Sequence, residues 1–393
     1  VTGVQTCALP ISTYCLAKWL QSTILLYNGE THSCHHPSRH KITMDDIKDN
    51  PKGIHNTIIK IHARQDLING VQTKECDYCW NIENLNNDWV SDRIYKSTYS
   101  WALPYLEEVK ASGLGENIDP TYMEVAFENT CNFKCLYCSP ESSSRWQREY
   151  QTVYGINKLP FHFYKNEFVQ DFINYTPKII HLDIPGGEPF LSGVKEQKQL
   201  LTHYIQTGQS KDISIHYTTN VTIYPDSEWW ELWKYFKEID MQLSIDGVGQ
   251  RYEYIRYPAN WNTVLENTSQ YLNQQKLLNN LRLSVSHTVS AYNIFYLDEF
   301  FTWCYNIGLP RPWLGRVHKP SFMRPSVWPK PVRDIIVTKL NLSNDQDVKQ
   351  WAELIRNTDD SNLFSEFKEK MQMHDEYRAL SFAQTFPELA NYI

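Results

Sequence analysis

The chain has 393 residues, of which 41% are hydrophobic and 21% charged, so it can bury a sizeable core and form two or three structural units. Its net charge of −7 argues against the basic surface that nucleic-acid-binding proteins need. No apolar run approaches the roughly 20 residues of a membrane span. We therefore expect a globular protein whose partners include neither nucleic acid nor a membrane.

The first segment, residues 1–11, has the sequence VTGVQTCALPI and looks like a translated sequencing-library adapter. We exclude it from fold prediction, as one would exclude a fusion scar. We expect the true start of the gene to be missing. Without this segment, eight of the nine cysteines remain to be explained.

Residues 12–115 contain Cys15, Cys34, Cys76 and Cys79. Gly29 lies in a Tyr-Asn-Gly-Glu stretch typical of a hairpin turn, which would bring Cys34 back beside Cys15. With the C-x2-C pair, these cysteines favour metal binding in a reducing, cytoplasmic setting over disulfides. One interpretation is a zinc knuckle, in which a histidine can replace a cysteine. The histidines near Cys34 are His32, His35, His36 and His40.

From about residue 116 to 320 the pattern alternates between apolar runs and helical stretches. This alternation predicts an α/β fold with parallel strands joined by crossover helices. Trp229 and Trp233 lie on one face of a predicted helix and are expected to pack in the core. The predicted strands are residues 123–127, 179–184, 213–217, 241–245, 283–287 and, more weakly, 313–317.

Just after the first of these strands, Cys131, Cys135 and Cys138 form a C-x3-C-x2-C motif, with Tyr137 before the last cysteine. Three thiolates this close together can hold three corners of a 4Fe–4S cluster and leave the fourth iron open to a small molecule. Zinc can also use closely spaced cysteines, so the spacing alone leaves both metals open.

A second motif, Gly186-Gly187-Glu188-Pro189, ends the next predicted strand. Glycines let backbone approach a ligand closely, and the acid offers a carboxylate to a cationic group. An ordinary strand-to-loop turn is the alternative. The order and position of the two motifs favour a shared ligand site.

These two motifs resemble the signature of the radical S-adenosylmethionine superfamily. The resemblance implies a partial (β/α)6 barrel, with the chemistry at the carboxyl ends of its strands. It implies a 4Fe–4S cluster on the three cysteines of the motif and S-adenosylmethionine on the open iron. It assigns cofactor binding to Tyr137, Gly186, Gly187, Glu188, Pro189, Asn220, Ser244, Asp246 and Arg256.

Within that assignment, Ser244 and Arg256 have the separation that grips the carboxylate of the cofactor in SPASM-type relatives. A guanidinium is well suited to bidentate carboxylate binding. The alternative is that Ser244 and Asp246 only make a turn and that Arg256 forms a surface ion pair.

The upstream cysteines, with Gly29, resemble the twitch and SPASM auxiliary-cluster modules of the same superfamily. Those modules usually follow the barrel, whereas here the cysteines precede it. The resemblance implies an auxiliary 4Fe–4S cluster, with zinc as the alternative.

The implied activity is reductive cleavage of S-adenosylmethionine to a 5′-deoxyadenosyl radical that abstracts hydrogen from a substrate, with a peptide or protein as the first expectation. A flavodoxin or ferredoxin would supply the electron. The alternative is a zinc-stabilised binding or scaffold protein on a degenerate barrel. We predict an auxiliary module over residues 12–115, the barrel over 116–320 and a helical extension over 321–393.

Overall fold

A computed structural model describes residues 13–48, 50–85, 90–156, 172–173, 175 and 177–393. The predicted adapter segment, residues 1–11, lies outside the described residues. Within the described part, nine strands form one sheet in the order β3-β2-β1-β4-β5-β6-β7-β8-β9. The strands are β1 (Gln21–Leu25), β2 (Glu30–His32), β3 (His40–Lys41), β4 (Tyr122–Ala126), β5 (His181–Ile184), β6 (Ser214–Thr219), β7 (Glu238–Ser244), β8 (Leu281–Val289) and β9 (Trp313–Arg316).

Each of the six apolar runs predicted between residues 116 and 320 contains or overlaps one of the strands β4 to β9. These strands follow one another in the sheet and all pair in parallel. Parallel pairing requires a crossover connection, and helices supply it between most of the pairs. The predicted α/β arrangement is therefore confirmed.

The other long regular elements of the described part are helices. Before the parallel strands and between them lie α1 (Ala17–Leu20), α2 (Met44–Ile47), α3 (Ile58–Ile68), α4 (Asp77–Leu85), α5 (Asp92–Lys96), α6 (Leu106–Ser112), α7 (Gln147–Tyr154), α9 (Val194–Gln206), α10 (Ser227–Trp233), α11 (Gln250–Ile255), α12 (Trp261–Leu277) and α13 (Leu297–Ile307). The C-terminal helices are α14 (Lys330–Asn341), α15 (Gln346–Asn357), α16 (Phe364–Arg378), α17 (Phe382–Thr385) and α18 (Pro387–Ala390). The described residues after β9 are thus largely helical, and the extension over residues 321–393 as a separate unit stays a prediction.

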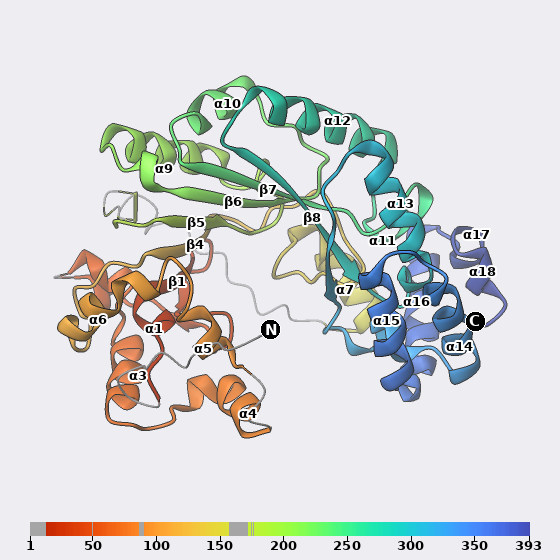
Figure 1. Ribbon diagram of the computed structural model, residues 1–393, viewed down its shortest axis with the longest axis horizontal. Helices are drawn as coiled ribbons and strands as arrows, with labels where there is room; N and C mark the ends of the chain where they lie inside the picture. Colours follow the sequence, from red (N-terminus) through yellow and green to blue (C-terminus); the bar gives the residue numbers. More distant parts are fainter. Residues whose placement is uncertain (1–12, 49, 86–89, 157–171, 174, 176) are drawn as a thin grey trace.

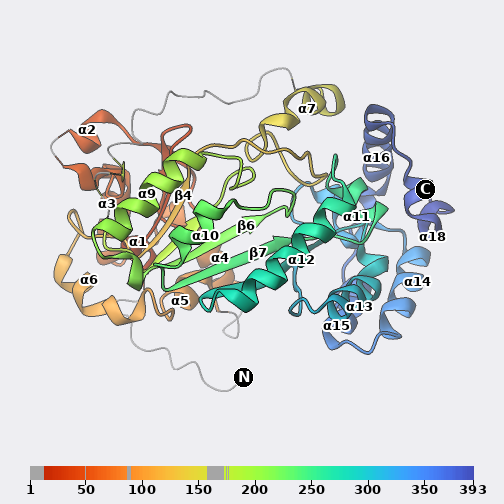
Figure 2. The same ribbon diagram turned by 90° about the horizontal axis from the view of Figure 1, so that it is seen from above.

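One face of the sheet is covered by α9, α10 and α12 (Figures 1 and 2). Along β8, every second residue, such as Leu281 and Val285, is buried, whereas the residues between them, such as Ser284 and Ser286, are only half-buried. A parallel sheet covered on both faces would be apolar on both. The alternation therefore indicates that the second face of this sheet is polar and partly open.

The N-terminal cysteine region extends the same sheet. Strand β1 pairs in parallel with β4, and the hairpin of β1 and β2 is antiparallel. This pairing crosses the predicted boundary at residues 115–116, so the N-terminal strands continue the main sheet at its β4 edge. The C-terminal helices α14 to α18 lie at the other end of the molecule, beyond β8 (Figure 1).

The predicted tryptophan helix packs against the strand ends. Trp229 and Trp233 of α10 are buried, and their rings contact Phe190 and Tyr217. Phe190 directly follows the glycine motif, so this aromatic cluster anchors that motif from the helical side. Among the described helices, none has the length and apolar character needed to cross a membrane.

Candidate metal and cofactor site

The loop after β4 carries Cys131, which is buried, and Cys135 and Cys138, which are half-buried. The Cys138 amide donates to the Cys135 carbonyl at 2.9 Å, which curls the loop. Burial raises the pKa of the Cys131 thiol to about 12 and raises the pKa of the other two thiols as well. An ionised Cys135 would raise the pKa of both neighbours further, because like charges repel. A cation bound among the sulfurs would remove this penalty.

Gly186 and Gly187 stand where β5 ends, with φ values of 109° and 25°. A Cβ atom at Gly186 would lie 2.6 Å from the Glu128 carbonyl oxygen, and one at Gly187 would lie 1.8 Å from the Thr130 carbonyl oxygen. The Glu188 amide completes the contact by donating to the Thr130 carbonyl at 2.9 Å. The glycines therefore let this strand end dock directly on the start of the cysteine loop.

Glu188 is fully buried at the same edge of the sheet. One carboxylate oxygen accepts from the Thr219 hydroxyl at 2.7 Å and the other from the Asn220 amide at 2.8 Å. Burial raises the pKa of this carboxyl to about 7. The next residue, Pro189, accepts a hydrogen bond from Gln197 of α9 at 2.8 Å. Glu188 thus ties the ends of β5 and β6 together, and its contact with a cofactor stays a prediction.

Two side-chain donors reach the cysteine sulfurs, one from the end of a strand and one from the end of a helix. Asn220, just after β6, places Nδ2 3.9 Å from Cys131 Sγ. Arg256, just after α11, places Nη1 3.9 Å from Cys135 Sγ. The positive charge of Arg256 lowers the pKa of the Cys135 thiol and so opposes the effect of burial. Both donors favour the thiolate form, which is the form in which cysteine binds a metal.

A buried ion pair orients Arg256. Its Nε donates to Asp246 Oδ2 at 2.5 Å, and Asp246 Oδ1 accepts from the Thr288 amide at 2.6 Å. Because both partners are buried, the alternative of a surface ion pair is wrong. Ser244 ends β7 two residues before Asp246 and is also buried. The fold therefore brings Ser244, Asp246 and Arg256 to the strand edge that carries the cysteines.

The hydroxyl of Tyr137 is buried and makes no hydrogen bond within the described residues. A buried hydroxyl without a partner costs free energy, which a bound ligand can recover. No group of three or more His, Cys, Asp or Glu side chains is closed around a single metal ion in the described part of the chain. A cluster differs from a single ion because each thiolate binds a different iron. The three thiols, their two donors and the unpaired hydroxyl fit such a cluster with a small ligand.

The upstream cysteines also come together. Cys15, Cys34, Cys76 and Cys79 are all buried and line one cavity. The predicted hairpin is confirmed, because β1 and β2 pair on either side of Gly29, which has a φ of 66°. Burial raises the pKa of Cys15 to about 12 and that of Cys76 to about 11. The local turn and the tertiary fold thus gather four cysteines from three segments.

Cations surround this cysteine cavity. Lys18, Arg93 and Lys96 line it together with the sulfurs, and the carboxylates of Glu75 and Asp92 line it as well. Lys18 is buried and pairs with Glu75 at 2.7 Å, and Arg93 pairs with Glu83 at 2.7 Å. Buried positive charge favours thiolates, as a metal or cluster requires. The cavity therefore fits an anionic sulfur-ligated group.

Of the four histidines considered as replacement ligands, His36 lines the cavity, and its Nε2 lies 2.8 Å from Asp92. The others bond elsewhere. His35 lies 3.5 Å from Glu124, His40 Nε2 lies 2.8 Å from the Thr57 hydroxyl, and His32 contacts the Cys34 carbonyl.

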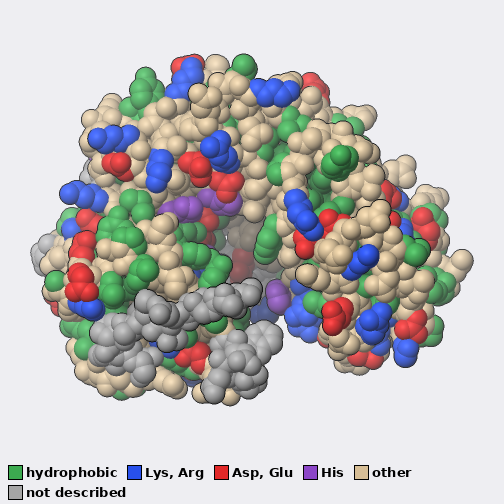
Figure 3. All heavy atoms as spheres, in the orientation of Figure 1, with side chains coloured by type: hydrophobic (Ala, Val, Ile, Leu, Met, Phe, Trp, Pro, Cys, Tyr) green, Lys and Arg blue, Asp and Glu red, His purple; other side chains and the backbone are tan. Residues whose placement is uncertain are grey.

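The polar face of the sheet was not predicted as a site. It carries a chain of contacts in which His216 binds Asp240 at 2.8 Å and Tyr122 donates to Asp183 at 3.1 Å. Glu124 lies beside Asp183 in register, and burial and that neighbour raise its pKa to about 7. Figure 3 shows the molecule hollowed at its centre, with histidine and acidic side chains at the margin of the hollow. The alternation of polar and apolar residues along the strands is the sequence feature that could have predicted this polar face.

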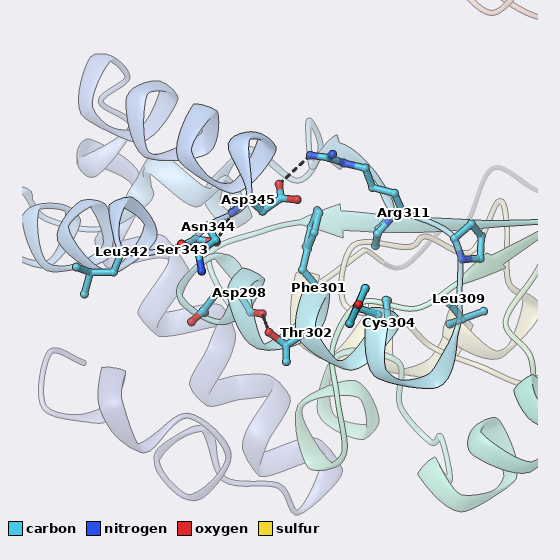
Figure 4. Close-up of a pocket in the computed structure, with 13 residues that line it drawn as sticks. Asp298, Phe301, Thr302, Cys304, Leu309, Arg311, Leu342, Ser343, Asn344 and Asp345 are labelled. Atoms are coloured by element: carbon cyan, nitrogen blue, oxygen red, sulfur yellow. Dashed lines mark hydrogen bonds and ion pairs between the residues drawn. The ribbon is translucent and has the colours of Figure 1, made fainter.

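A separate cavity of about 620 Å³ lies between α13 and the loop before α15 (Figure 4). Arg311 spans it and donates to Asp345 at 2.9 Å and to Asp347 at 2.8 Å. Cys304 on α13 is buried, as expected for a small core residue. None of the predicted site residues lines this cavity.

No family model matches the chain, and no curated protein matches it. Solved structures do. One match is "Native anSMEcpe with bound AdoMet", with 15% identity, a TM-score of 0.40, and coverage of 56% of this chain and 59% of that chain. The match thus spans less than two thirds of anSMEcpe.

Streptococcus suis SuiB bound to S-adenosylmethionine matches over 95% of this chain and 74% of its own, with 12% identity and a TM-score of 0.35. SuiB bound to its precursor peptide SuiA gives 12% identity and a TM-score of 0.37. At such identities and TM-scores, the residues of the chain itself must carry the functional assignment.

Proposed function

We propose that this chain is a radical S-adenosylmethionine enzyme that abstracts hydrogen from a peptide or protein substrate. The observation that supports this proposal most is the docking of the Gly186–Gly187 strand end on the cysteine loop. That docking brings together, at one sheet edge, one buried and two half-buried cysteines and two donors directed at their sulfurs.

Cys131, Cys135 and Cys138 would hold the 4Fe–4S cluster. When bound, the cluster and S-adenosylmethionine supply an electron and a 5′-deoxyadenosyl radical. The protein contributes orientation, charge and exclusion of water. Asn220 and Arg256 stabilise thiolate charge at two of the three sulfurs by donating toward them.

The remaining edge residues would hold the cofactor. Arg256 keeps its guanidinium fixed through Asp246, so the face that is not used by the ion pair can meet a carboxylate, with Ser244 as a neighbour. Glu188 holds the ends of β5 and β6 in register, and its negative charge would favour an ammonium group nearby. Tyr137 offers an unpaired hydroxyl.

We further propose a second 4Fe–4S cluster on Cys15, Cys34, Cys76 and Cys79, with zinc as the alternative. The cations beside these sulfurs support an anionic group of either kind. An auxiliary cluster there would accept an electron from the substrate radical or bind the substrate. A flavodoxin or ferredoxin would be the reductant.

The substrate would lie against the polar face of the sheet, which adjoins the cysteine edge. Hydrogen-bonding groups on β4 to β8, such as Tyr122 and His216, suit the polar backbone of a peptide. Both anSMEcpe and SuiB have been solved with a peptide bound.

The test is anaerobic reconstitution followed by incubation with dithionite and S-adenosylmethionine. We expect 5′-deoxyadenosine from the wild type and none from a triple Cys→Ala variant at residues 131, 135 and 138. The matched control is Cys304→Ala, which removes a buried thiol that lines the separate cavity beside α13. A wild type that binds zinc and makes no 5′-deoxyadenosine would instead support the scaffold alternative.

A further inference from the structure

Hydrogen bonds from three other parts of the fold hold the cysteine loop in place. Its Lys134 amide donates to the Tyr257 carbonyl at 2.6 Å, and its Leu136 amide donates to the Ile255 carbonyl at 2.9 Å. Directly before α7, the Trp146 indole donates to the Cys135 carbonyl at 3.1 Å. The third contact comes from α16, in the C-terminal extension that sequence patterns left without a function.

That third contact is Arg378. Its Nη2 donates to the Lys134 carbonyl at 2.7 Å, directly before Cys135. Its Nε donates to Glu149 Oε1 at 2.7 Å, and the ammonium of Lys134 lies 2.7 Å from Glu149 Oε2. His374, one turn earlier on α16, contacts Glu149 at 2.8 Å. One carboxylate of α7 therefore binds the cysteine loop and α16 together.

The three side chains from α7 and α16 in this network are buried inside the protein. The side chains of Arg378 and Glu149 are 0% exposed and that of His374 is 1% exposed. The guanidinium also lies 5.1 Å from the ring centres of Trp146 and Tyr257. Its Nη1 makes no hydrogen bond within the described residues. Buried charges are costly unless they are paired, so this geometry is strongly fixed.

The network also carries a net positive charge beside the thiolates. Lys134 and Arg378 are cations, and Glu149 balances one of them. His374 adds no charge near neutral pH, because burial lowers its pKa below the usual value. A fixed positive charge beside a redox centre stabilises its reduced, more negative state.

We propose that Arg378, with Glu149, is a positioning residue that makes the C-terminal helix α16 part of the cluster site, by fixing the loop at Lys134 and placing a buried positive charge beside Cys135. The inference rests on the proposed function, because it presumes that the three cysteines hold the cluster. It predicts that the extension affects the electronic properties of the cluster as well as the stability of the fold.

The experiment compares Arg378→Met and Arg378→Lys in the full reconstituted chain. The signal followed is the electron paramagnetic resonance of the reduced cluster that changes when S-adenosylmethionine is added. Arg378→Met should lower its reduction potential, because a buried positive charge is lost. Arg378→Lys should leave the potential near that of the wild type, since the charge is kept.

Both variants should lose the cluster to a chelator roughly tenfold faster or more, because the planar fork that joins Glu149 to the Lys134 carbonyl is gone. The matched control is Arg333→Met. Arg333 is also buried in the extension, where it binds Asp359 at 2.6 Å and donates to the Thr358 carbonyl. The Arg333→Met variant should change thermal stability without changing the reduction potential of the cluster or its rate of release.

A potential and a release rate equal to those of the wild type in Arg378→Met would overturn the proposal. If that variant does not fold, an unchanged release rate in Arg378→Lys would overturn it as well. A wild type without any cluster signal would reject the proposed function itself, which is a different result.

Discussion

Cys131, Cys135 and Cys138 come from one short loop, whereas Cys15, Cys34, Cys76 and Cys79 come from three segments between residues 15 and 79. The loop is shaped by its own backbone hydrogen bonds and by the strand ends on which it docks. The upstream cavity exists only because a hairpin and two helices meet. A site made from one loop is therefore specified locally, and a site made from several segments depends on the fold.

The two sites also differ in how charge is supplied. At the loop, the near donors are Arg256, held by Asp246, and the amide of Asn220. At the upstream cavity, lysines and an arginine line the space together with the sulfurs. Both arrangements offset the burial that raises thiol pKa values, but the loop does so with donors fixed by strand ends. We expect the loop site to remain intact when the upstream site is lost. We do not expect the upstream site to remain intact when the loop site is lost.

The sharpest test of this difference is Cys76→Ala/Cys79→Ala. Iron should fall from about eight to about four per chain, on the count for two 4Fe–4S clusters. Residues 13–115 should become more susceptible to proteolysis, because ligands contribute folding energy only when they bind. Formation of 5′-deoxyadenosine at the loop should persist.

Iron analysis with zinc analysis decides the outcome. About four iron and one zinc in the unmutated protein would favour the zinc knuckle at the upstream site. Loss of all iron in the double variant would show that the two sites are not independent.

The second prediction concerns the donor at Cys135. Arg256→Lys keeps a positive charge near Asp246 but loses the fork that serves both Asp246 and the sulfur. Loss of a charge-assisted contact of about 1.5–3 kcal/mol should weaken S-adenosylmethionine binding tenfold or more. Isothermal titration calorimetry on the reconstituted protein measures the affinity for S-adenosylmethionine.

Arg282→Lys is the matched control, because that side chain is 61% exposed on the same sheet. Equal affinities for the two variants would remove Arg256 from the cofactor site.

The third prediction distinguishes two roles of Glu188: its negative charge in cofactor binding and its hydrogen bonds in joining β5 to β6. Glu188→Gln can still accept from the Asn220 amide and donate to the Thr219 hydroxyl, so iron content and folding should be retained. The lost negative charge should weaken cofactor binding roughly tenfold. If affinity is unchanged while thermal stability falls, Glu188 acts only as the link between β5 and β6.

The smallest functional effect is expected where strand β1 of the N-terminal region pairs with strand β4 of the main sheet. Glu124 on β4 accepts from Thr23 on β1 at 3.0 Å, and its pKa is raised to about 7 by burial and by Asp183. A carboxyl whose folded pKa exceeds its unfolded value stabilises the fold at low pH and loses that contribution as pH rises through about 7.

The difference in the free energy of unfolding between Glu124→Gln and the wild type should therefore be more favourable to the variant at pH 8 than at pH 5, by about 1–3 kcal/mol. Iron content should not change. Chemical denaturation at the two pH values measures this difference in free energy. Glu238→Gln, on the same face at the start of β7, serves as the control because its side chain is 43% exposed. A wild type whose stability rises between pH 5 and pH 8 by the same amount as the variant would contradict the assignment.

Several features followed from the sequence alone because their signal is local. The cysteine spacing lies within one loop, the Gly29 turn within four residues, and each strand of β4 to β9 within one apolar run. Hydrophobic alternation and turn chemistry act over a few residues, so they survive without knowledge of the fold.

Other features were decided only by the tertiary structure. The pairing of Glu149 with Arg378, the burial of Arg256 against Asp246 and the use of both Glu188 oxygens join residues that are distant in sequence or change role on burial. A charged side chain looks the same in sequence whether it faces solvent or a buried partner. Its environment sets the cost of its charge, and the packing of strands and helices creates that environment.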